Sequence, residues 1–117
     1  NSIFVVAPST KEIRLREVTS ACSGFVYAAS LMGVTGIRTA NSNQAEDLVS
    51  RIRSVTSLPV AVGLGVSNAA QAKEVSKFAD GVIVGSAFIA KVQSAKDFDS
   101  ALVAVENLAR ELKAGIN

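Results

Sequence analysis

The sequence contains no histidine and no tryptophan, and its only cysteine is Cys22. A single cysteine cannot form a disulfide within the chain. The lack of histidine excludes a Cys-His nucleophile and disfavours a zinc-type site, because imidazole is a common zinc ligand. We therefore predict that Cys22 is a half-buried packing residue and that the chain holds no metal.

Long apolar runs and blocks of like charge are also missing. No stretch approaches the roughly 20 apolar residues that cross a bilayer, and the first residues do not follow the order of a signal peptide. The 12 basic and 10 acidic residues are scattered, which disfavours a nucleic-acid or polybasic membrane surface. These absences predict a cytoplasmic protein that binds neither nucleic acid nor membrane. With 49% apolar and 19% charged residues, the chain is expected to form one folded domain over residues 1–117.

Short apolar runs alternate with amphipathic segments along the chain. The runs predict strands over residues 3–7, 24–30, 60–64 and 81–84. Helices are expected from a capping box at Ser9 and Glu12, over 44–55, from Ser67 or Asn68, near 87–92 and over 98–114, where Leu102, Val105, Leu108, Ala109 and Leu112 form a stripe. The polar segment 31–43 reads as a loop. Four strand-helix units of this kind predict an α/β fold with a parallel sheet covered by helices.

Two glycine turns follow the last two predicted strands. They are Gly63-Leu64-Gly65-Val66-Ser67 and Gly85-Ser86-Ala87. A turn that follows a strand and opens a helix directs backbone N–H groups at one point, and glycine lets an anion come close. We predict that the two turns share one phosphate. No carboxylate follows a strand, and Asp80 precedes one, where it is expected to make a turn or an ion pair.

The place of these turns separates two architectures. An open doubly wound sheet that binds a dinucleotide carries G-x-G-x-x-G after its first strand, whereas here that strand ends in Ala7-Pro8-Ser9. TIM barrels commonly bind phosphate after their last strands. We therefore favour the C-terminal half, with four strands, of a (β/α)8 barrel, since a whole barrel takes about 250 residues.

Four segments resemble the tryptophan synthase alpha chain family: residues 24–30, 33–36, 59–67 and 79–87. The Gly33-Val34-Thr35-Gly36 loop is the distinctive one, because the later glycine turns also occur in barrels such as phosphoribosylanthranilate isomerase and indole-glycerol-phosphate synthase. The resemblance implies a lyase of tryptophan biosynthesis that cleaves indole-3-glycerol phosphate to indole and glyceraldehyde 3-phosphate. It also implies a beta subunit that receives the indole and carries the pyridoxal phosphate, so that this chain needs no cofactor.

The resemblance also assigns roles to single residues. It implies phosphate contacts at Gly36, Gly65, Gly85 and Ser86, an indole pocket at Tyr27, Leu64 and Ile83, and loop closure by Thr35, which supports a catalytic carboxylate. Leu64 stands where many members have an aromatic residue. Plain turns at the glycines and ordinary barrel packing at Ile83 are the simpler alternatives.

The family's general acid and base are a glutamate and an aspartate on earlier strands, and the 117 residues contain neither. We therefore expect the isolated segment to be inactive. A half barrel has unpaired strand edges and should not be stable as a monomer. The chain is then a piece of a longer protein, which we expect, or it pairs with its missing N-terminal half, or it associates with itself. The alternative function is a noncatalytic phosphate-binding or self-assembling half-barrel module.

Overall fold

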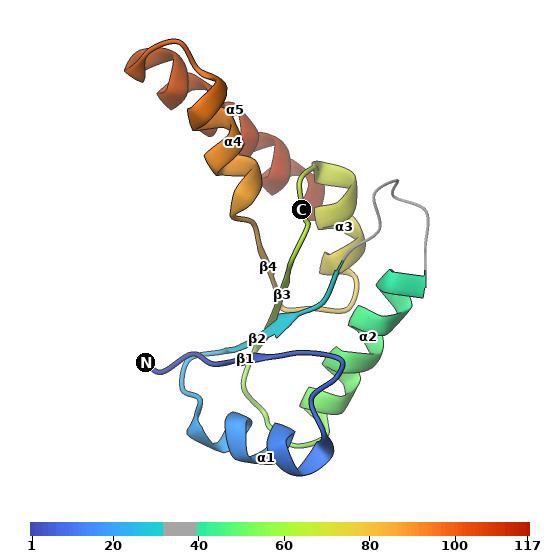
Figure 1. The fold of residues 1–117 in the computed structure, drawn as a ribbon. Coiled ribbons are helices and arrows are strands. Elements are labelled where there is room, and N and C mark those ends of the chain that lie inside the picture. The colour runs from blue at the N-terminus through green and yellow to red at the C-terminus, as the bar shows by residue number, and fades with distance from the viewer. Residues whose placement is uncertain (32–39) are drawn as a thin grey trace.

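The computed structural model describes residues 1–31 and 40–117, and it contains a four-stranded parallel sheet with helices along it (Figure 1). The strands are β1 (Val5–Val6), β2 (Val26–Ala29), β3 (Val60–Gly63) and β4 (Gly81–Ile83). The helices are α1 (Glu12–Ala21), α2 (Ala40–Arg53), α3 (Ala69–Ser76), α4 (Ser86–Ser94) and α5 (Phe98–Ile116). The sheet order β1-β2-β3-β4 follows the chain, which is the simplest result of repeated right-handed crossovers.

The strands bury one face of the sheet against the helices. The buried strand residues are Val6, Val26, Ala28, Val60 and Val62, and they form one core with residues of α1, α2 and α3, including Leu15, Leu48, Ile52 and Val75. Successive side chains on a strand point to opposite faces. Val5, Tyr27 and Ala61, which pair in register, therefore lie on the other face, where Val5 is 58% exposed. The sheet thus has one face covered by helices and one left open.

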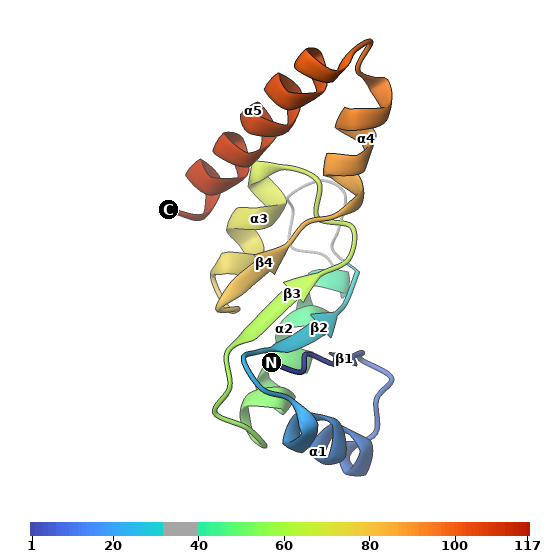
Figure 2. The same ribbon diagram turned by 90° about the vertical axis from the view of Figure 1, so that its left-hand side faces the viewer.

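Helices α4 and α5 form a hairpin that projects beyond the carboxyl end of the sheet (Figure 2). Helix α5 contacts α3 and α4. The expected stripe along α5 is buried only at its C-terminal end, at Leu108 and Leu112, whereas Leu102 is 53% exposed and Ala109 is exposed. The prediction was wrong for these two residues. The N-terminal part of α5 runs alongside α4 in the projecting hairpin rather than over the sheet (Figures 1 and 2).

The capping box predicted at Ser9 and Glu12 does not form. Lys11 is the N-cap of α1 and makes no side-chain cap bond, while Glu12 begins the helix. The carboxylate of Glu12 instead accepts a hydrogen bond from Arg51 Nε of α2 at 2.6 Å. The Glu12 side chain therefore binds α2 instead of capping its own helix.

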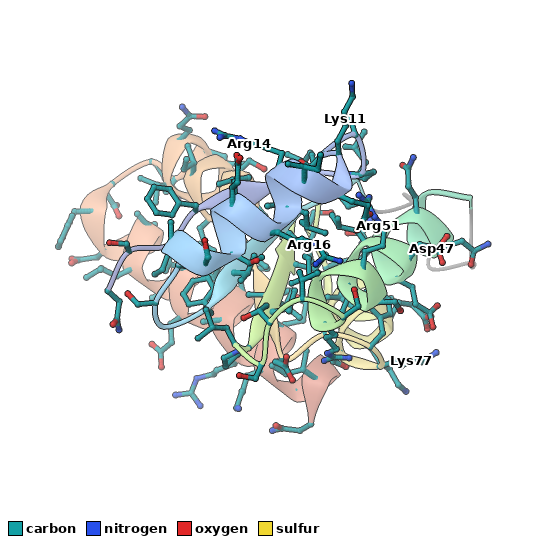
Figure 3. The ribbon with its side chains drawn as sticks, turned by 90° about the horizontal axis from the view of Figure 1, so that it is seen from below. Lys11, Arg14, Arg16, Asp47, Arg51 and Lys77 are labelled. Atoms are coloured by element: carbon teal, nitrogen blue, oxygen red, sulfur yellow. The ribbon has the colours of Figure 1, made fainter. Side chains whose placement is uncertain are left out.

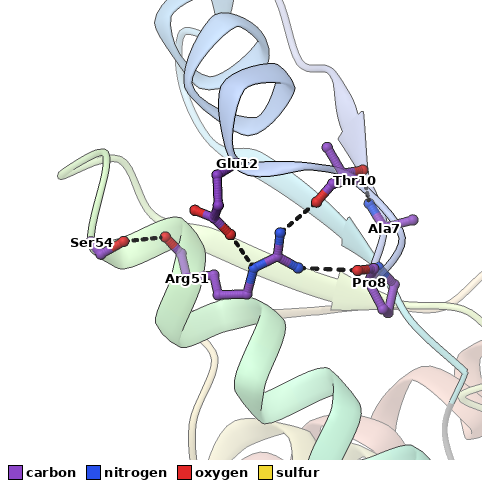
Figure 4. Close-up of polar contacts among 6 residues, drawn as sticks. All are labelled: Ala7, Pro8, Thr10, Glu12, Arg51 and Ser54. Carbon is purple, nitrogen blue, oxygen red and sulfur yellow. Dashed lines mark hydrogen bonds and ion pairs between the residues drawn. The ribbon is translucent and has the colours of Figure 1, made fainter.

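Arg51 ties α2 to the turn between β1 and α1 (Figure 4). Its guanidinium donates to the carbonyl oxygen of Pro8 at 3.1 Å and also to that of Thr10. The turn itself is closed by the amide of Ala7, which donates to Thr10 Oγ1 at 3.0 Å. The planar guanidinium has enough N–H donors to bind the carbonyl oxygens of Pro8 and Thr10 and the carboxylate of Glu12 at the same time.

Three further sequence predictions have clear outcomes. Helix α2 begins at Ala40 and not at residue 44, so residues 40–43, which were predicted as loop, are helical. Cys22 is half-buried and packs against the core, as predicted. Asp80 precedes β4 and forms an ion pair with Arg53 at 3.1 Å, also as predicted. None of the helices in the described ranges is long and apolar enough to cross a membrane.

Candidate functional site

Three residues of neighbouring strands converge on the open face of the sheet, near its carboxyl end. Gly63 pairs with Ile83 in the parallel register of β3 and β4. A methyl group placed on Gly63 would lie 2.7 Å from Ile83 Cβ and 3.1 Å from the hydroxyl oxygen of Tyr27. The structure therefore brings Tyr27 and Ile83, two of the predicted indole-pocket residues, to opposite sides of the same glycine.

The turn between β3 and α3 has an unusual backbone. Leu64 has φ 130° and Gly65 has φ +78°. Glycine adopts positive φ without steric cost, whereas such a conformation costs other residues on the order of 1–3 kcal/mol. Leu64 is also 49% exposed, so its side chain gains little burial in return. This strained leucine follows directly on the close contact at Gly63.

The space beside Gly65 is open. A methyl group on Gly65 would meet no described atom closer than Leu31 Cδ2 at 3.9 Å. An anion can therefore approach the backbone here, which is the role that the sequence predicts for this glycine.

The turn between β4 and α4 leads directly into a helix. Gly85 is the N-cap of α4 and makes no side-chain cap bond, and Ser86 is the first helical residue. The amides of Phe88 and Ile89 donate to the carbonyl oxygen of Gly85 at 3.0 and 3.3 Å. The amides of Ser86 and Ala87 therefore lie ahead of the first intrahelical bond, where the helix dipole favours an anion. A methyl group on Gly85 would have no described atom within 4 Å.

Neither glycine turn contains a lysine or an arginine. The basic side chains labelled in Figure 3 come from α1 and its N-cap, from α2 and from the C-cap of α3: Lys11, Arg14, Arg16, Arg51 and Lys77. The two turns themselves offer an anion backbone N–H groups, and α4 adds its dipole.

All ten carboxylates of the sequence lie in the described ranges, and none is at the carboxyl end of a described strand. Asp80 is at the amino end of β4, where the amide of Val60 donates to it at 2.9 Å. That bond and the bond from Arg53 hold the pKa of Asp80 below its ordinary value. The amide and hydroxyl of Ser100 likewise lower the pKa of Asp97 at the start of α5. Both carboxylates have structural partners and stand apart from the glycine turns.

Two predicted residues, Thr35 and Gly36, lie outside the described residues. Tyr27 is the second residue of β2, and only its hydroxyl oxygen comes close to Gly63, so the prediction that it stands near the carboxyl end of its strand was wrong for its backbone. The others lie at or just beyond the carboxyl ends of β3 and β4: Leu64, Gly65, Ile83, Gly85 and Ser86. Within the parts of the chain that the structure describes, no three His, Cys, Asp or Glu side chains could together hold a metal ion.

Sequence reasoning missed two residues beside the site, Val5 and Ser30, and placed Gly63 only in the phosphate turn. Val5 lies next to Tyr27 in the register, and Gly63 is also the contact point described above. Ser30 is only 1% exposed, and its hydroxyl has no hydrogen-bond partner among the described residues. Its amide donates to the carbonyl oxygen of Gly63 at 3.2 Å. Strand alternation would have placed Val5 beside Tyr27, but only if the register between distant strands had been known.

The chain is similar to known proteins over nearly its whole length. The family model described as "Tryptophan synthase alpha chain" matches residues 1–117. The tryptophan synthase alpha chain of Streptomyces avermitilis is 62% identical over 115 residues, which are 98% of this chain and 42% of that protein. That of Thermobifida fusca is 53% identical over 117 residues and is covered to 43%. The chain thus spans about two fifths of the length of the curated relatives it matches.

Solved structures of the same family have a similar fold. A crystal structure of Mycobacterium tuberculosis tryptophan synthase in an aminoacrylate-bound form matches 98% of this chain, with 40% identity and a TM-score of 0.80, and 40% of that chain is covered. A mutant tryptophan synthase alpha-subunit from Pyrococcus furiosus matches 96% of this chain, with 31% identity, a TM-score of 0.76 and 44% of that chain covered. The predicted fold class, consecutive parallel strand-helix units of a (β/α)8 barrel, is confirmed.

Proposed function

This chain belongs to the tryptophan synthase alpha chain family, and we propose that it supplies the phosphate grip and part of the indole pocket for the aldol cleavage of indole-3-glycerol phosphate. The observation that carries the proposal is the pair of glycine turns beyond the adjacent strands β3 and β4. Both have open space at a glycine, and one leads into an uncapped helix N-terminus. A TIM barrel commonly binds phosphate at this position.

The phosphate is held without a fixed cation in this proposal. The amides of Gly65 and Ser86 and the hydroxyl of Ser86 donate to its oxygens, and the dipole of α4 adds roughly half a positive charge. Gly36 belongs to the same group of ligands by family resemblance. A rigid set of backbone donors fixes the position of the substrate and so presents its glycerol chain to the reacting groups.

The indole ring packs on the open face of the sheet. Tyr27 and Ile83 flank Gly63 there, and the half-exposed Leu64 stands at the rim. Gly63 places no side chain between these two residues. An aromatic ring that packs against their side chains gains binding free energy from the burial of its apolar surface.

The reaction needs a general acid to protonate the indole ring and a general base to remove a hydroxyl proton. No described strand of this segment carries a carboxylate at its carboxyl end. We propose that both groups come from the remaining strands of the barrel and that Thr35 orients one of them. The 117 residues alone then bind phosphate but release no indole, and the whole chain passes indole to a beta subunit without a cofactor of its own.

The open face of the sheet supports the proposal that the remaining strands of the barrel complete the site. Val5 of β1 is a large apolar residue that is 58% exposed on this face. In a closed barrel the remaining strands cover such residues. The same exposed face and the missing carboxylates also favour the alternative, a noncatalytic phosphate-binding or self-assembling half barrel.

One experiment separates the two functions. The 117-residue chain and the full-length chain that contains it are each titrated with glycerol 3-phosphate and assayed for indole release from indole-3-glycerol phosphate. We expect indole release from the full-length chain only, and phosphate binding that Gly85→Val weakens in both. Indole release by the 117 residues alone, or a full-length chain that binds glycerol phosphate and releases no indole, would contradict the proposal.

A further inference from the structure

Gln71 in the first turn of α3 is a buried amide with an unusual pair of contacts. Its side chain is 3% exposed. Its Oε1 accepts a hydrogen bond from the backbone amide of Ser67 at 2.8 Å and another from the Ser67 hydroxyl at 3.0 Å. Burial of an amide is unfavourable unless its polar atoms are paired, so these contacts fix the position of both residues.

The contacts differ from an ordinary helix cap. Asn68 is the N-cap of α3, and its Oδ1 accepts from the amide of Gln71 at 2.9 Å. In a capping box the third helical residue reaches back to the amide of the N-cap residue itself. Here the side chain of Gln71 reaches one residue further, to Ser67, and so holds the incoming turn rather than the helix.

That turn is the strained one. Its first residue, Gly63, is fixed in the sheet, where its carbonyl oxygen also accepts from the amide of Ser30. Leu64 and Gly65 follow with positive φ, and Val66 is buried in the core. A leucine at positive φ relaxes towards a common conformation if the end of the turn is free to move. The amide of Gly65 would then change direction.

We propose that Gln71 is a positioning residue, whose hydrogen bonds to Ser67 preorganise the backbone around Gly65 for a phosphate monoester. This inference rests on the function proposed above. A neutral amide suits the role, because a carboxylate in its place would accept the same two bonds but bring a negative charge close to the phosphate. Preorganised donors bind better because less freedom is lost on binding.

The test uses the full-length chain that contains this segment. Gln71→Met keeps the length of the side chain and removes its whole amide, and Gln71→Glu keeps an acceptor at the same place. Asn68→Ala is the matched control, because it removes the neighbouring cap of the same helix and leaves the Ser67 contacts in place. Each variant is titrated with glycerol 3-phosphate, assayed for KM and kcat, and examined by amide hydrogen exchange at Ser67 and Gly65 without ligand.

We expect Gln71→Met to weaken glycerol 3-phosphate binding about tenfold, as the loss of one or two hydrogen bonds predicts. KM should rise by a similar factor while kcat changes less than about threefold. Protection of the Ser67 amide should fall in Gln71→Met, return in Gln71→Glu and persist in Asn68→Ala. Binding by Asn68→Ala should stay within about twofold of the unchanged chain.

Two results would overturn the inference while leaving the proposed function intact. One is unchanged phosphate affinity in Gln71→Met, and the other is an equal loss of affinity in Asn68→Ala, which would make the effect one of helix stability alone. If the unchanged chain does not bind glycerol 3-phosphate at all, the proposed phosphate site fails, and the role of Gln71 in phosphate binding fails with it. The hydrogen-exchange data would then show only whether Gln71 holds the backbone of the turn.

Discussion

Gly63 and Ile83 approach so closely across β3 and β4 that a methyl group on Gly63 would stand 2.7 Å from Ile83 Cβ and 2.8 Å from the Ile83 carbonyl oxygen. Real side-chain contacts are longer than this, and a backbone oxygen cannot rotate away. The pairing of these two strands therefore depends on glycine at position 63.

Gly63→Ala is expected to destabilise the full-length chain by about 1–3 kcal/mol through overpacking. Urea unfolding measures the change. Ile83→Ala in the same chain should recover little of the loss, because alanine keeps both close atoms, the Cβ and the carbonyl oxygen. Gly81→Ala is the control, since its added methyl group would lie 3.4 Å from Ala61 Cβ, an ordinary contact. Equal losses from Gly63→Ala and Gly81→Ala would show that the close contact has no special cost.

Gly85→Ala is expected to leave the fold intact and to weaken phosphate binding. The added methyl group would meet no described atom within 4 Å. That open space is where the proposed phosphate lies, so the methyl group should raise the dissociation constant for glycerol 3-phosphate about tenfold or more, or about 1.4 kcal/mol. Calorimetric titration beside a thermal unfolding curve checks both parts. Unchanged affinity would place the phosphate elsewhere.

Arg51→Met is expected to cost about 2 kcal/mol of unfolding free energy. The substitution leaves the carbonyl oxygens of Pro8 and Thr10 without a charged donor, and such hydrogen bonds are worth about 1.5–3 kcal/mol. Arg51→Lys should recover little, because an ammonium group cannot reproduce the planar fork of donors. Glu12→Gln should cost less than about 1 kcal/mol, since this carboxylate is largely exposed to solvent. Full recovery by lysine would show that charge alone matters here.

Asp80→Asn is expected to lower stability at pH 7 and to have little effect in acid. The pKa of Asp80 is lowered in the folded chain, chiefly by the amide of Val60 and then by Arg53, so its ionised form stabilises the fold. This contribution is complete above the ordinary pKa of 3.8 and is lost as pH falls from there through the lowered pKa of the folded state. We expect a difference of about 1 kcal/mol at neutral pH, because the half-exposed pair is screened. Unfolding curves at pH 7 and near pH 2 for both chains check this; a difference that persists in acid would contradict it.

Local pattern explains the predictions that succeeded. The order of strands and helices follows from apolar runs alternating with amphipathic segments, and the N-cap of α3 follows from Asn68, whose short side chain accepts from the amide of Gln71. The glycine turns were also recognisable, because strand, glycine and helix follow one another directly in the sequence.

Contacts between distant residues explain the predictions that failed. Ser9 and Glu12 have the spacing of a capping box, but Arg51, 39 residues further along, binds Glu12 instead. The start of α2 was placed too late at residue 44, because the apolar spacing on which the prediction relied begins only at Ala45. The exposure of Leu102 depends on where α5 runs relative to α3, which no periodicity within α5 can reveal.

The sequence by itself determined the parallel α/β class, the two glycine turns and the absence of a strand-end carboxylate, since each depends on residues close together in the chain. Only the tertiary structure decided that Tyr27 and Ile83 meet at Gly63 and that Ser30 is buried next to this strand. The physical reason is that strand register and helix packing are set by the burial of the whole core, in which every residue contributes and no local segment decides alone.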